Sequence, residues 1–278
     1  VEQAGIDKNQ IDAIAVANQP GLTVALIVGL TAAKTLALVL DKPLIAINHI
    51  HAYLQSAMME TADLALPAVA LVVSGGHTSL YECDNILDLR LLGSTIDDAA
   101  GEAFDKVASI LNLPYPGGPS IEKTAREGNP DAISFPRTML AKDSLDFSFS
   151  GLKTAVLYYC CGQDMKGQSR AAEMSRREIA DIAASFQAAV IDVLVKKTQM
   201  AADRYSARTI LLGGGVAANT MLRTELEKMA NQTGRKLLVA PKKYCTDNGV
   251  MIASLAYHKF KAGMFADMSL EVKAGVED

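Results

Sequence analysis

The sequence predicts an α/β protein with mixed sheets and flanking helices. Short apolar runs rich in β-branched residues and bounded by turn residues have the pattern of buried strands. Longer helical stretches separate most of these runs, and this alternation is typical of a parallel or mixed sheet. The chain has 278 residues, of which 50% are hydrophobic and 21% charged. That is enough for a sizeable core in one large or two smaller lobes.

The predicted elements follow from the lengths and periods of these runs. We expect strands at 11–18, 43–48, 67–74, 78–83, 89–94, 208–214 and 236–241. We expect helices at 22–40, 50–60, 98–112, 171–203, 216–232 and 247–262. The three strands within 67–94 follow one another through turns, which predicts an antiparallel meander. Residues 114–170 are rich in proline, glycine and polar residues, and we interpret them as an insertion beside the main sheet.

Composition narrows the class of protein. The net charge of −4 argues against a uniformly basic nucleic-acid binder and leaves room for local basic patches. The four cysteines have no CxxC spacing, which favours a reduced, cytosolic compartment. Residues 21–40 are almost apolar enough to span a bilayer, but Lys34 inside them would cost about 2.5–3.5 kcal/mol on insertion. We therefore expect a buried helix there and no membrane span.

Two glycine-rich turns are candidate phosphate sites. Ser74-Gly75-Gly76 joins two predicted strands, and Gly213-Gly214-Gly215 joins a strand to a helix. Glycine lets backbone N–H groups approach a phosphate, and a helix N-terminus adds partial positive charge. Neither turn matches the P-loop or GxGxxG pattern. Taken singly, each turn is as well explained by a connection that binds no ligand as by a phosphate site. The presence of both turns favours a nucleotide bound between two lobes.

Acidic residues and a rigid loop follow the meander. Asp98, Glu102 and Asp105 share one helix face by their spacing, which suits Mg²⁺, ribose hydroxyls or simply a solvated acidic surface. The segment PYPGGPS (114–120) is either a fixed wall against a ligand or a helix stop.

Two further motifs raise the question of a metal. In INHIHAYLQS, His49 and His51 suggest a metal site, a catalytic base or a histidine-rich helix start. Asp247 precedes a predicted helix, where an N-cap is the first interpretation and a metal ligand the second. The HEXXH pattern of metallopeptidases is absent.

Eight segments in order resemble one protein family: NQPGLTVALIVGLTAAKTLA, INHIHAY, VVSGGHTSL, DDAAGEAFDKVA, YPGGPSIEK, DFSFSGLKTAV, GGGVAANTMLR and CTDNG. They are similar to the TsaD family of tRNA threonylcarbamoyladenosine synthesis proteins, in its bacterial and mitochondrial branch. The resemblance implies a two-lobed actin/Hsp70/sugar-kinase-like fold with the active site in the cleft. Residues 1–94 would form the N-terminal lobe and 95–278 the C-terminal lobe, with the insertion around 114–170.

The resemblance also implies an activity: transfer of the threonylcarbamoyl group from threonylcarbamoyl-AMP to N6 of adenosine 37 in tRNAs that read codons starting with A. The nucleotide would contact Val72, Val73, Ser74, Gly75, Gly76, Asp105, Gly118, Glu122 and Asn219. A divalent metal, iron or zinc, would be held by His49, Tyr53 and Asp247, and Mg²⁺ would accompany the nucleotide. The bound nucleotide would be threonylcarbamoyl-AMP or ATP.

The implied partners are tRNA, TsaB-like and TsaE-like subunits and a second copy of the chain, in the cytoplasm and without a membrane. Basic residues are the candidate tRNA contacts: Arg170, Arg176, Arg177, Lys196, Lys197, Arg235, Lys236, Lys242 and Lys243.

The sequence departs from the family at two places. The family begins with a strand and a glycine/serine-rich turn that are not seen here, so we expect a chain lacking a few dozen N-terminal residues. Its metal motif has two histidines four residues apart, whereas here His49 is followed at that spacing by Tyr53. Whether Tyr53 or His51 completes the site stays open at this point. The alternative functions are a sugar or acyl kinase of the same fold, a metallopeptidase and a non-catalytic scaffold.

Overall fold

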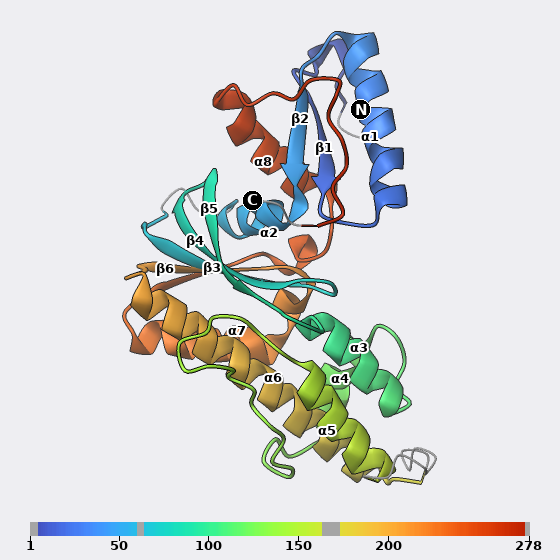
Figure 1. The fold of residues 1–278 in the computed structure, drawn as a ribbon, viewed down its shortest axis with the longest axis vertical. Helices are drawn as coiled ribbons and strands as arrows, with labels where there is room; N and C mark the ends of the chain where they lie inside the picture. The colour runs from blue at the N-terminus through green and yellow to red at the C-terminus, as the bar shows by residue number, and fades with distance from the viewer. Residues whose placement is uncertain (1–4, 60–63, 163–172, 276–278) are drawn as a thin grey trace.

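The computed structural model describes residues 5–59, 64–162 and 173–275, and these form two sheets. A two-stranded parallel sheet joins β1 (Ile14–Gln19) to β2 (Leu44–Asn48). A five-stranded sheet has the order β5-β4-β3-β6-β7. The two-stranded sheet lies at one end of an elongated molecule, the five-stranded sheet in the middle and a group of helices at the other end (Figure 1).

The five-stranded sheet is mixed, as predicted. Its strands are β3 (Ala68–Val73), β4 (Thr78–Asn85), β5 (Asp88–Ser94), β6 (Thr209–Gly213) and β7 (Lys236–Val239). The first three form the predicted antiparallel meander, and β6 runs parallel to β3 and β7. All seven predicted strands are thereby confirmed. The sheet takes strands from both sides of residue 95, and the lobe boundary expected there stays a prediction.

Register places the two glycine turns side by side. Val72 of β3 is paired with Gly213 of β6, so the carboxyl ends of these parallel strands meet at one edge of the sheet. In open α/β sheets that edge is where ligands bind.

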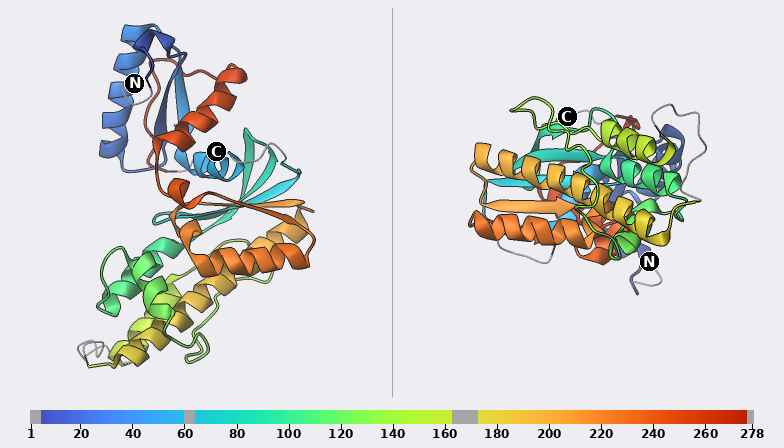
Figure 2. Two further views of the ribbon diagram at one scale, coloured as in Figure 1. Left: turned by 180° about the vertical axis from the view of Figure 1, so that it is seen from behind. Right: turned by 90° about the horizontal axis from the view of Figure 1, so that it is seen from below.

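Helices cover both faces of this sheet. The α-helices of the described chain are α1 (Thr23–Leu40), α2 (His49–Met58), α3 (Ala100–Ile110), α4 (Gly117–Ala125), α5 (Ser150–Cys161), α6 (Arg176–Arg204), α7 (Thr220–Gln232) and α8 (Gly249–Lys261), of which α1 packs against the two-stranded sheet instead. Alternate residues of β3 supply two separate cores: Val69, Leu71 and Val73 face α3 and α6, whereas Ala68, Ala70 and Val72 face α2 and α8. Figures 1 and 2 show α2 on one side of the sheet and α6 and α7 on the other.

The insertion is more structured than the sequence indicated. It contains α4 and α5, and Phe135, Phe147 and Phe149 from it are buried in the same core as α6. Lys197 of α6 is fully buried and donates to the carbonyls of Met139 and Ser144 at 2.9 and 2.8 Å. It therefore anchors the insertion and is wrong as a tRNA contact. Arg170 lies outside the described residues.

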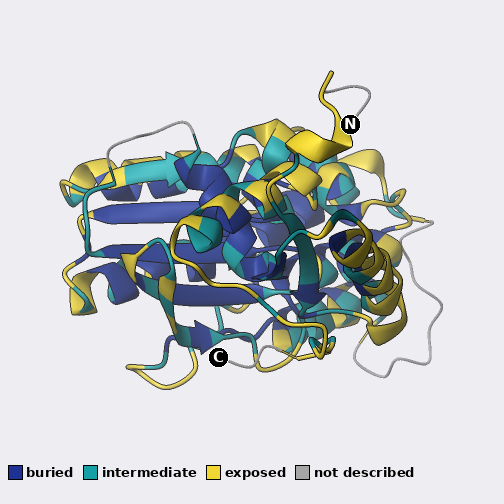
Figure 3. Ribbon diagram, turned by 90° about the horizontal axis from the view of Figure 1, so that it is seen from above, coloured by how far each residue is buried: buried dark blue, intermediate teal, exposed yellow. Residues whose placement is uncertain are grey.

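The apolar helix α1 differs from expectation. Only Leu30, Ala33 and Ala37 of it are buried, against the small two-stranded sheet, so the expected buried helix is wrong. It is long and apolar enough to cross a bilayer by composition, but a core helix or a signal sequence passes the same test. Figure 3 shows the contrast between the buried strands and helices with exposed outer sides.

Candidate active site

The turn after β3 is pressed against the start of α3. Ser74 Oγ accepts a hydrogen bond from the N–H of His77 at 3.1 Å, which closes the turn. Gly101 of α3 donates its N–H to the carbonyl of Ser74 at 3.2 Å, and a Cβ at Gly101 would lie 2.5 Å from that oxygen. Gly75 and Gly76 are exposed and face open space, so this turn offers its backbone to a ligand.

The valines before this turn have a different role. Val72 and Val73 are fully buried, and their side chains belong to the two cores described above. The carbonyl of Val73 lies 2.4 Å from where a Cβ of Gly214 would stand, and Gly214 has a φ of +94°. Both the close approach and the left-handed backbone require glycine here. The valines therefore position the two turns, and their side chains are shielded from a ligand.

Asn219 follows the second glycine turn. Its Oδ1 caps α7 by accepting from the N–H of Leu222 at 3.0 Å, and its Nδ2 donates to Oε1 of Gln187 on α6 at 2.8 Å. Both side chains are buried. Gln187 is thus a buried polar residue that holds Asn219 in place, and the sequence carries no local signal for it.

A cavity of about 300 Å³ opens between the two glycine turns. Its lining includes five of the predicted nucleotide residues: Gly75, Asp105, Gly118, Glu122 and Asn219. Tyr115, Val216 and Thr246 also line it and were not among the predicted nucleotide contacts, although Tyr115 belongs to the segment 114–120 that the sequence offered as a wall against a ligand. A larger cavity of about 700 Å³ lies between the two-stranded sheet and α8, but its lining is mostly apolar and holds none of the predicted residues. The smaller cavity is therefore the candidate site.

Two carboxylates hold the walls of this cavity together. Asp105 Oδ1 accepts the N–H of Gly117 at 2.7 Å, and a Cβ at Gly117 would lie 2.5 Å from Cα of Asp105. Glu122 Oε1 accepts the N–H of Thr220 at 3.1 Å. These bonds join α3 to α4 and α4 to α7, so the carboxylates sit at fixed positions on the cavity wall.

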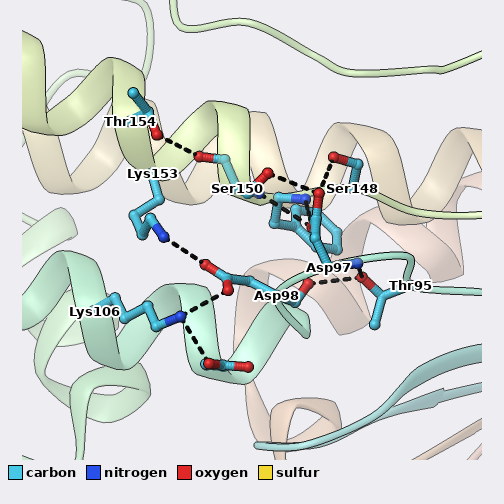
Figure 4. Close-up of polar contacts among 10 residues, drawn as sticks. Thr95, Asp97, Asp98, Lys106, Ser148, Ser150, Lys153 and Thr154 are labelled. Carbon is cyan, nitrogen blue, oxygen red and sulfur yellow. Dashed lines mark hydrogen bonds and ion pairs between the residues drawn. The ribbon is translucent and has the colours of Figure 1, made fainter.

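The other two carboxylates of the predicted acidic face, Asp98 and Glu102, form ion pairs with lysines. Asp98 forms ion pairs with Lys106 and Lys153 at 2.7 and 3.0 Å, and Lys106 also pairs with Glu102 at 2.7 Å (Figure 4). Burial acts to raise the pKa of Asp98, but the bonds from the two lysines hold it below its usual range. Since lysines neutralise Asp98 and Glu102, the acidic helix does not present three carboxylates to one Mg²⁺ ion.

A second polar cluster adjoins the cavity. The hydroxyl of Tyr53 donates to Oδ1 of Asp247 at 2.6 Å, and Asp247 directly follows Thr246 of the cavity lining. The ring centroid of His49 lies 5.8 Å from that of Tyr53 and 5.5 Å from that of His77. Burial and the neighbouring His49 lower the pKa of His77 to about 4, although Asp247 opposes this shift.

The structure places the candidate residues of two alternatives that the sequence left open. His51 packs edge-on against Tyr81 of β4 at 5.6 Å, whereas Tyr53 is the residue that contacts Asp247. Asp247 is not the helix cap, because Asn248 Oδ1 accepts the N–H of Met251 at 2.9 Å and caps α8.

Comparison with known proteins decides the family. Residues 1–254 match the family model described as TsaD, tRNA N6-adenosine threonylcarbamoyltransferase. The chain belongs to the TsaD family. A tRNA N6-adenosine threonylcarbamoyltransferase of Moorella thermoacetica is 53% identical over 267 residues, covering 96% of this chain and 76% of the relative. One of Rhodopirellula baltica is 48% identical over 289 residues, covering 99% and 79%.

Solved structures show the fold of this TsaD-family chain. HypF of T. kodakarensis superposes with a TM-score of 0.67 at 15% identity, over 92% of this chain and 41% of HypF. Component A of (R)-2-hydroxyglutaryl-CoA dehydratase of Acidaminococcus fermentans gives 0.51 at 16% identity, over 94% and 81%. At these identities the likeness concerns the fold alone. The fold is the two-lobed actin/Hsp70/sugar-kinase type, as predicted.

The side chains around Tyr53 do not fit the metal that the TsaD resemblance implies. No group of three or more His, Cys, Asp or Glu side chains is arranged to hold a metal within the part of the chain that the structure describes. Burial, followed by the hydrogen bond to Asp247, raises the pKa of Tyr53 well above its ordinary value. The phenol therefore keeps its proton at neutral pH, and a protonated phenol is a poor ligand for iron or zinc.

Proposed function

We propose that this chain transfers the threonylcarbamoyl group from threonylcarbamoyl-AMP to N6 of adenosine 37 in tRNAs that read codons starting with A. Its family membership supports this activity. The observation that carries it is the cavity of about 300 Å³ between the two glycine turns, which gathers five residues expected to contact the nucleotide. Val72, Val73, Ser74 and Gly76 complete the proposed binding set by shaping or forming the first turn.

The reaction needs no enzyme nucleophile. The N6 nitrogen of the adenine attacks the carbamoyl carbon, and the bond from that carbon to the phosphate oxygen breaks. AMP leaves with the bonding electron pair, and N6 loses one proton to solvent. The work of the protein is then to hold the reactants together and to stabilise charge on the leaving phosphate. The exposed amides of Gly75 and Gly76 and the N-terminus of α3 behind them suit this role.

No step of this proposal passes through a metal ion. An iron or zinc ion at His49, Tyr53 and Asp247 stays a prediction of the resemblance, which the geometry around Tyr53 does not favour. Mg²⁺ would reach the site with the phosphates of its nucleotide, threonylcarbamoyl-AMP or ATP, by which it is usually held.

Basic side chains near the cavity are the proposed tRNA contacts. Lys242 and Lys243 are exposed on the segment between β7 and α8, a few residues before Thr246 of the cavity lining. Arg176 and Arg177 are exposed too, but they already pair with Glu127 and Asp181. We therefore favour the two lysines as phosphate contacts beside the reacting base.

Partner subunits complete the proposal. We assign a TsaB-like subunit to the exposed apolar side of α1, where Val24, Val28 and Val39 are each at least 70% exposed. A TsaE-like subunit and a second copy of the chain are the other partners that the resemblance implies, in the cytoplasm.

A transfer assay tests the function. The chain, partner subunits, threonylcarbamoyl-AMP and tRNA are incubated together, and the modified nucleoside is quantified by mass spectrometry after digestion. We expect modification of tRNA with adenosine at position 37 and none of a matched tRNA with guanosine there. Absence of modification under these conditions would refute the proposal. Phosphorylation of a small substrate by ATP without tRNA would favour the kinase alternative instead.

A further inference from the structure

Tyr115 is an aromatic side chain exposed at the nucleotide cavity. It lines the cavity yet is 84% exposed, more than any other large hydrophobic residue that the structure describes. No aromatic ring or cation among the described residues packs against its ring. The ring therefore contributes little to the core and stands at the cavity mouth.

The backbone around Tyr115 is held firmly. Pro114 and Pro116 flank it, and the carbonyl of Pro114 accepts a hydrogen bond from Ser120 Oγ at 2.5 Å. On the other side, Gly117 donates its N–H to Asp105 at 2.7 Å. Two prolines and two hydrogen bonds thus restrain the backbone that carries an aromatic ring whose own faces remain open, and a restrained backbone lowers the entropy cost of binding.

The interior and the mouth of the cavity are lined by different side chains, and each suits a different reactant. Phe104, Pro119 and Val216 give the interior an apolar wall, which suits the part of the activated nucleotide that is buried. Tyr115 lies at the mouth, where the second reactant has to enter. That reactant is a base in an RNA loop, and an enzyme that modifies a base must take it out of its stack.

Unstacking a base costs free energy, and stacking that base on an aromatic side chain offsets part of this cost. We propose that Tyr115 is the stacking platform for the accepting adenine of the tRNA, and that it holds N6 of this base at the cavity mouth. The inference rests on the proposed function, which it extends by naming the residue that positions the second substrate.

Fluorescence gives a direct test, because the chain contains no tryptophan. In Tyr115→Trp, the introduced indole is the single tryptophan reporter. We expect an anticodon stem-loop RNA to quench its emission on binding, and the same RNA with an abasic nucleotide at position 37 to quench far less. AMP alone should leave the emission unchanged. Equal quenching by both RNAs, or quenching by AMP alone, would overturn the inference.

Kinetics separate this inference from the proposed function. Tyr115→Ala should raise the KM for tRNA about tenfold, within the range that base–aromatic stacking supplies, and leave the KM for threonylcarbamoyl-AMP unchanged. Tyr115→Phe keeps the ring and should behave as the unmodified chain. Tyr158→Ala removes another exposed tyrosine, on α5, and is the matched control. A tRNA KM unaltered in Tyr115→Ala refutes the stacking role, while transfer by the unmodified chain still upholds the function.

Discussion

The hydroxyl of Tyr53 on α2 donates a 2.6 Å hydrogen bond to Oδ1 of Asp247, just before α8. The two residues lie 194 positions apart in the sequence, so this bond joins distant segments beside the nucleotide cavity. Tyr53 stands where the family resemblance implies a second histidine. A tyrosine at this position therefore supplies a neutral hydrogen-bond donor to Asp247, where a histidine could supply a metal ligand.

Restoring the histidine should create a metal site. His49 and position 53 are one helical turn apart on α2, and a pair of histidines at that spacing binds zinc from one helix face, with Asp247 as a third ligand. We expect Tyr53→His to retain about one zinc ion per chain after dialysis against trace metal. The unmodified chain should retain much less, as measured by inductively coupled plasma mass spectrometry.

A matched variant controls this experiment. His51→Ala should not alter metal content in either background, because His51 packs against Tyr81 instead of Asp247. The opposite outcome would be one zinc ion per unmodified chain that is lost in His49→Ala. This result would show that the Tyr53 hydroxyl leaves Asp247 when the metal binds, and that the prediction of a metal site was right.

The pKa of His77 predicts how stability depends on pH. Burial and His49 lower this pKa from 6.5 to about 4, so between these values the unfolded chain binds more protons than the folded one. Stability therefore rises with pH across this window. The contribution is fully present above pH 6.5 and is lost as the pH falls towards 4. We expect about 1–2 kcal/mol, reduced for the part of the ring that faces solvent.

Urea unfolding at pH 7.5 and pH 5 measures this contribution. The loss in the free energy of unfolding on acidification should be smaller in His77→Gln, which cannot be protonated. An equal loss in both proteins would assign the pH dependence to other groups.

Substitution by alanine should have different effects at the two neighbouring glycines of α4: weaker ligand binding at Gly118 and lower stability at Gly117. Gly118 lines the cavity, and a Cβ there would meet no protein atom within 4 Å, so Gly118→Ala should fold normally. The added methyl enters space offered to the nucleotide and should weaken AMP binding about fivefold, equivalent to ~1 kcal/mol of overpacking. Titration calorimetry measures this affinity.

Gly117→Ala is the contrasting variant. Its Cβ would lie 2.5 Å from Cα of Asp105, so it should lower the free energy of unfolding by about 1–3 kcal/mol. Unchanged AMP affinity in Gly118→Ala would argue that the nucleotide binds elsewhere.

The strands and the glycine turns could be predicted because their signals are local. β-Branched runs and glycine clusters report a backbone requirement within a few residues, and all seven strands were found. The contacts of the site could not be predicted in this way. The ring of His77 contacts that of His49 because the turn between β3 and β4 packs beside α2. Gln187 contacts Asn219 because α6 packs against the face of the sheet from which α7 also extends. Neither pairing leaves a pattern in the nearby sequence.

Helix α5 was missed for a related reason. The polar, proline-rich sequence before it hides its start, and its N-terminus is capped from outside the helix. Asp97 Oδ1 accepts the N–H groups of Phe149 and Ser150 at 2.9 and 3.2 Å, and Oδ2 accepts from the hydroxyls of Ser148 and Ser150 (Figure 4). The sequence places Asp97 at the start of α3, whereas the structure uses it for α5.

This cap gives a last prediction. Asp97→Asn removes the negative charge from the N-terminus of α5 and weakens the bonds from Ser148 and Ser150. It should lower the free energy of unfolding at pH 7 by about 0.5–2 kcal/mol, as measured by urea unfolding. Burial acts to raise the pKa of Asp97, but these hydrogen bonds hold it below 3.8. The stabilisation is therefore present above pH 3.8 and is lost as the pH falls through the lowered pKa.

The control is Asp131→Asn, an exposed aspartate whose side chain forms no hydrogen bond or ion pair with the described residues. It should leave the unfolding free energy unchanged within about 0.5 kcal/mol. Because Asp98 beside Asp97 pairs with Lys153 of α5, the two aspartates together hold α5 against α3, which forms one wall of the cavity. A cap that acts only on stability would leave AMP affinity intact in Asp97→Asn, whereas a weaker affinity would show that α5 also sets the position of that wall.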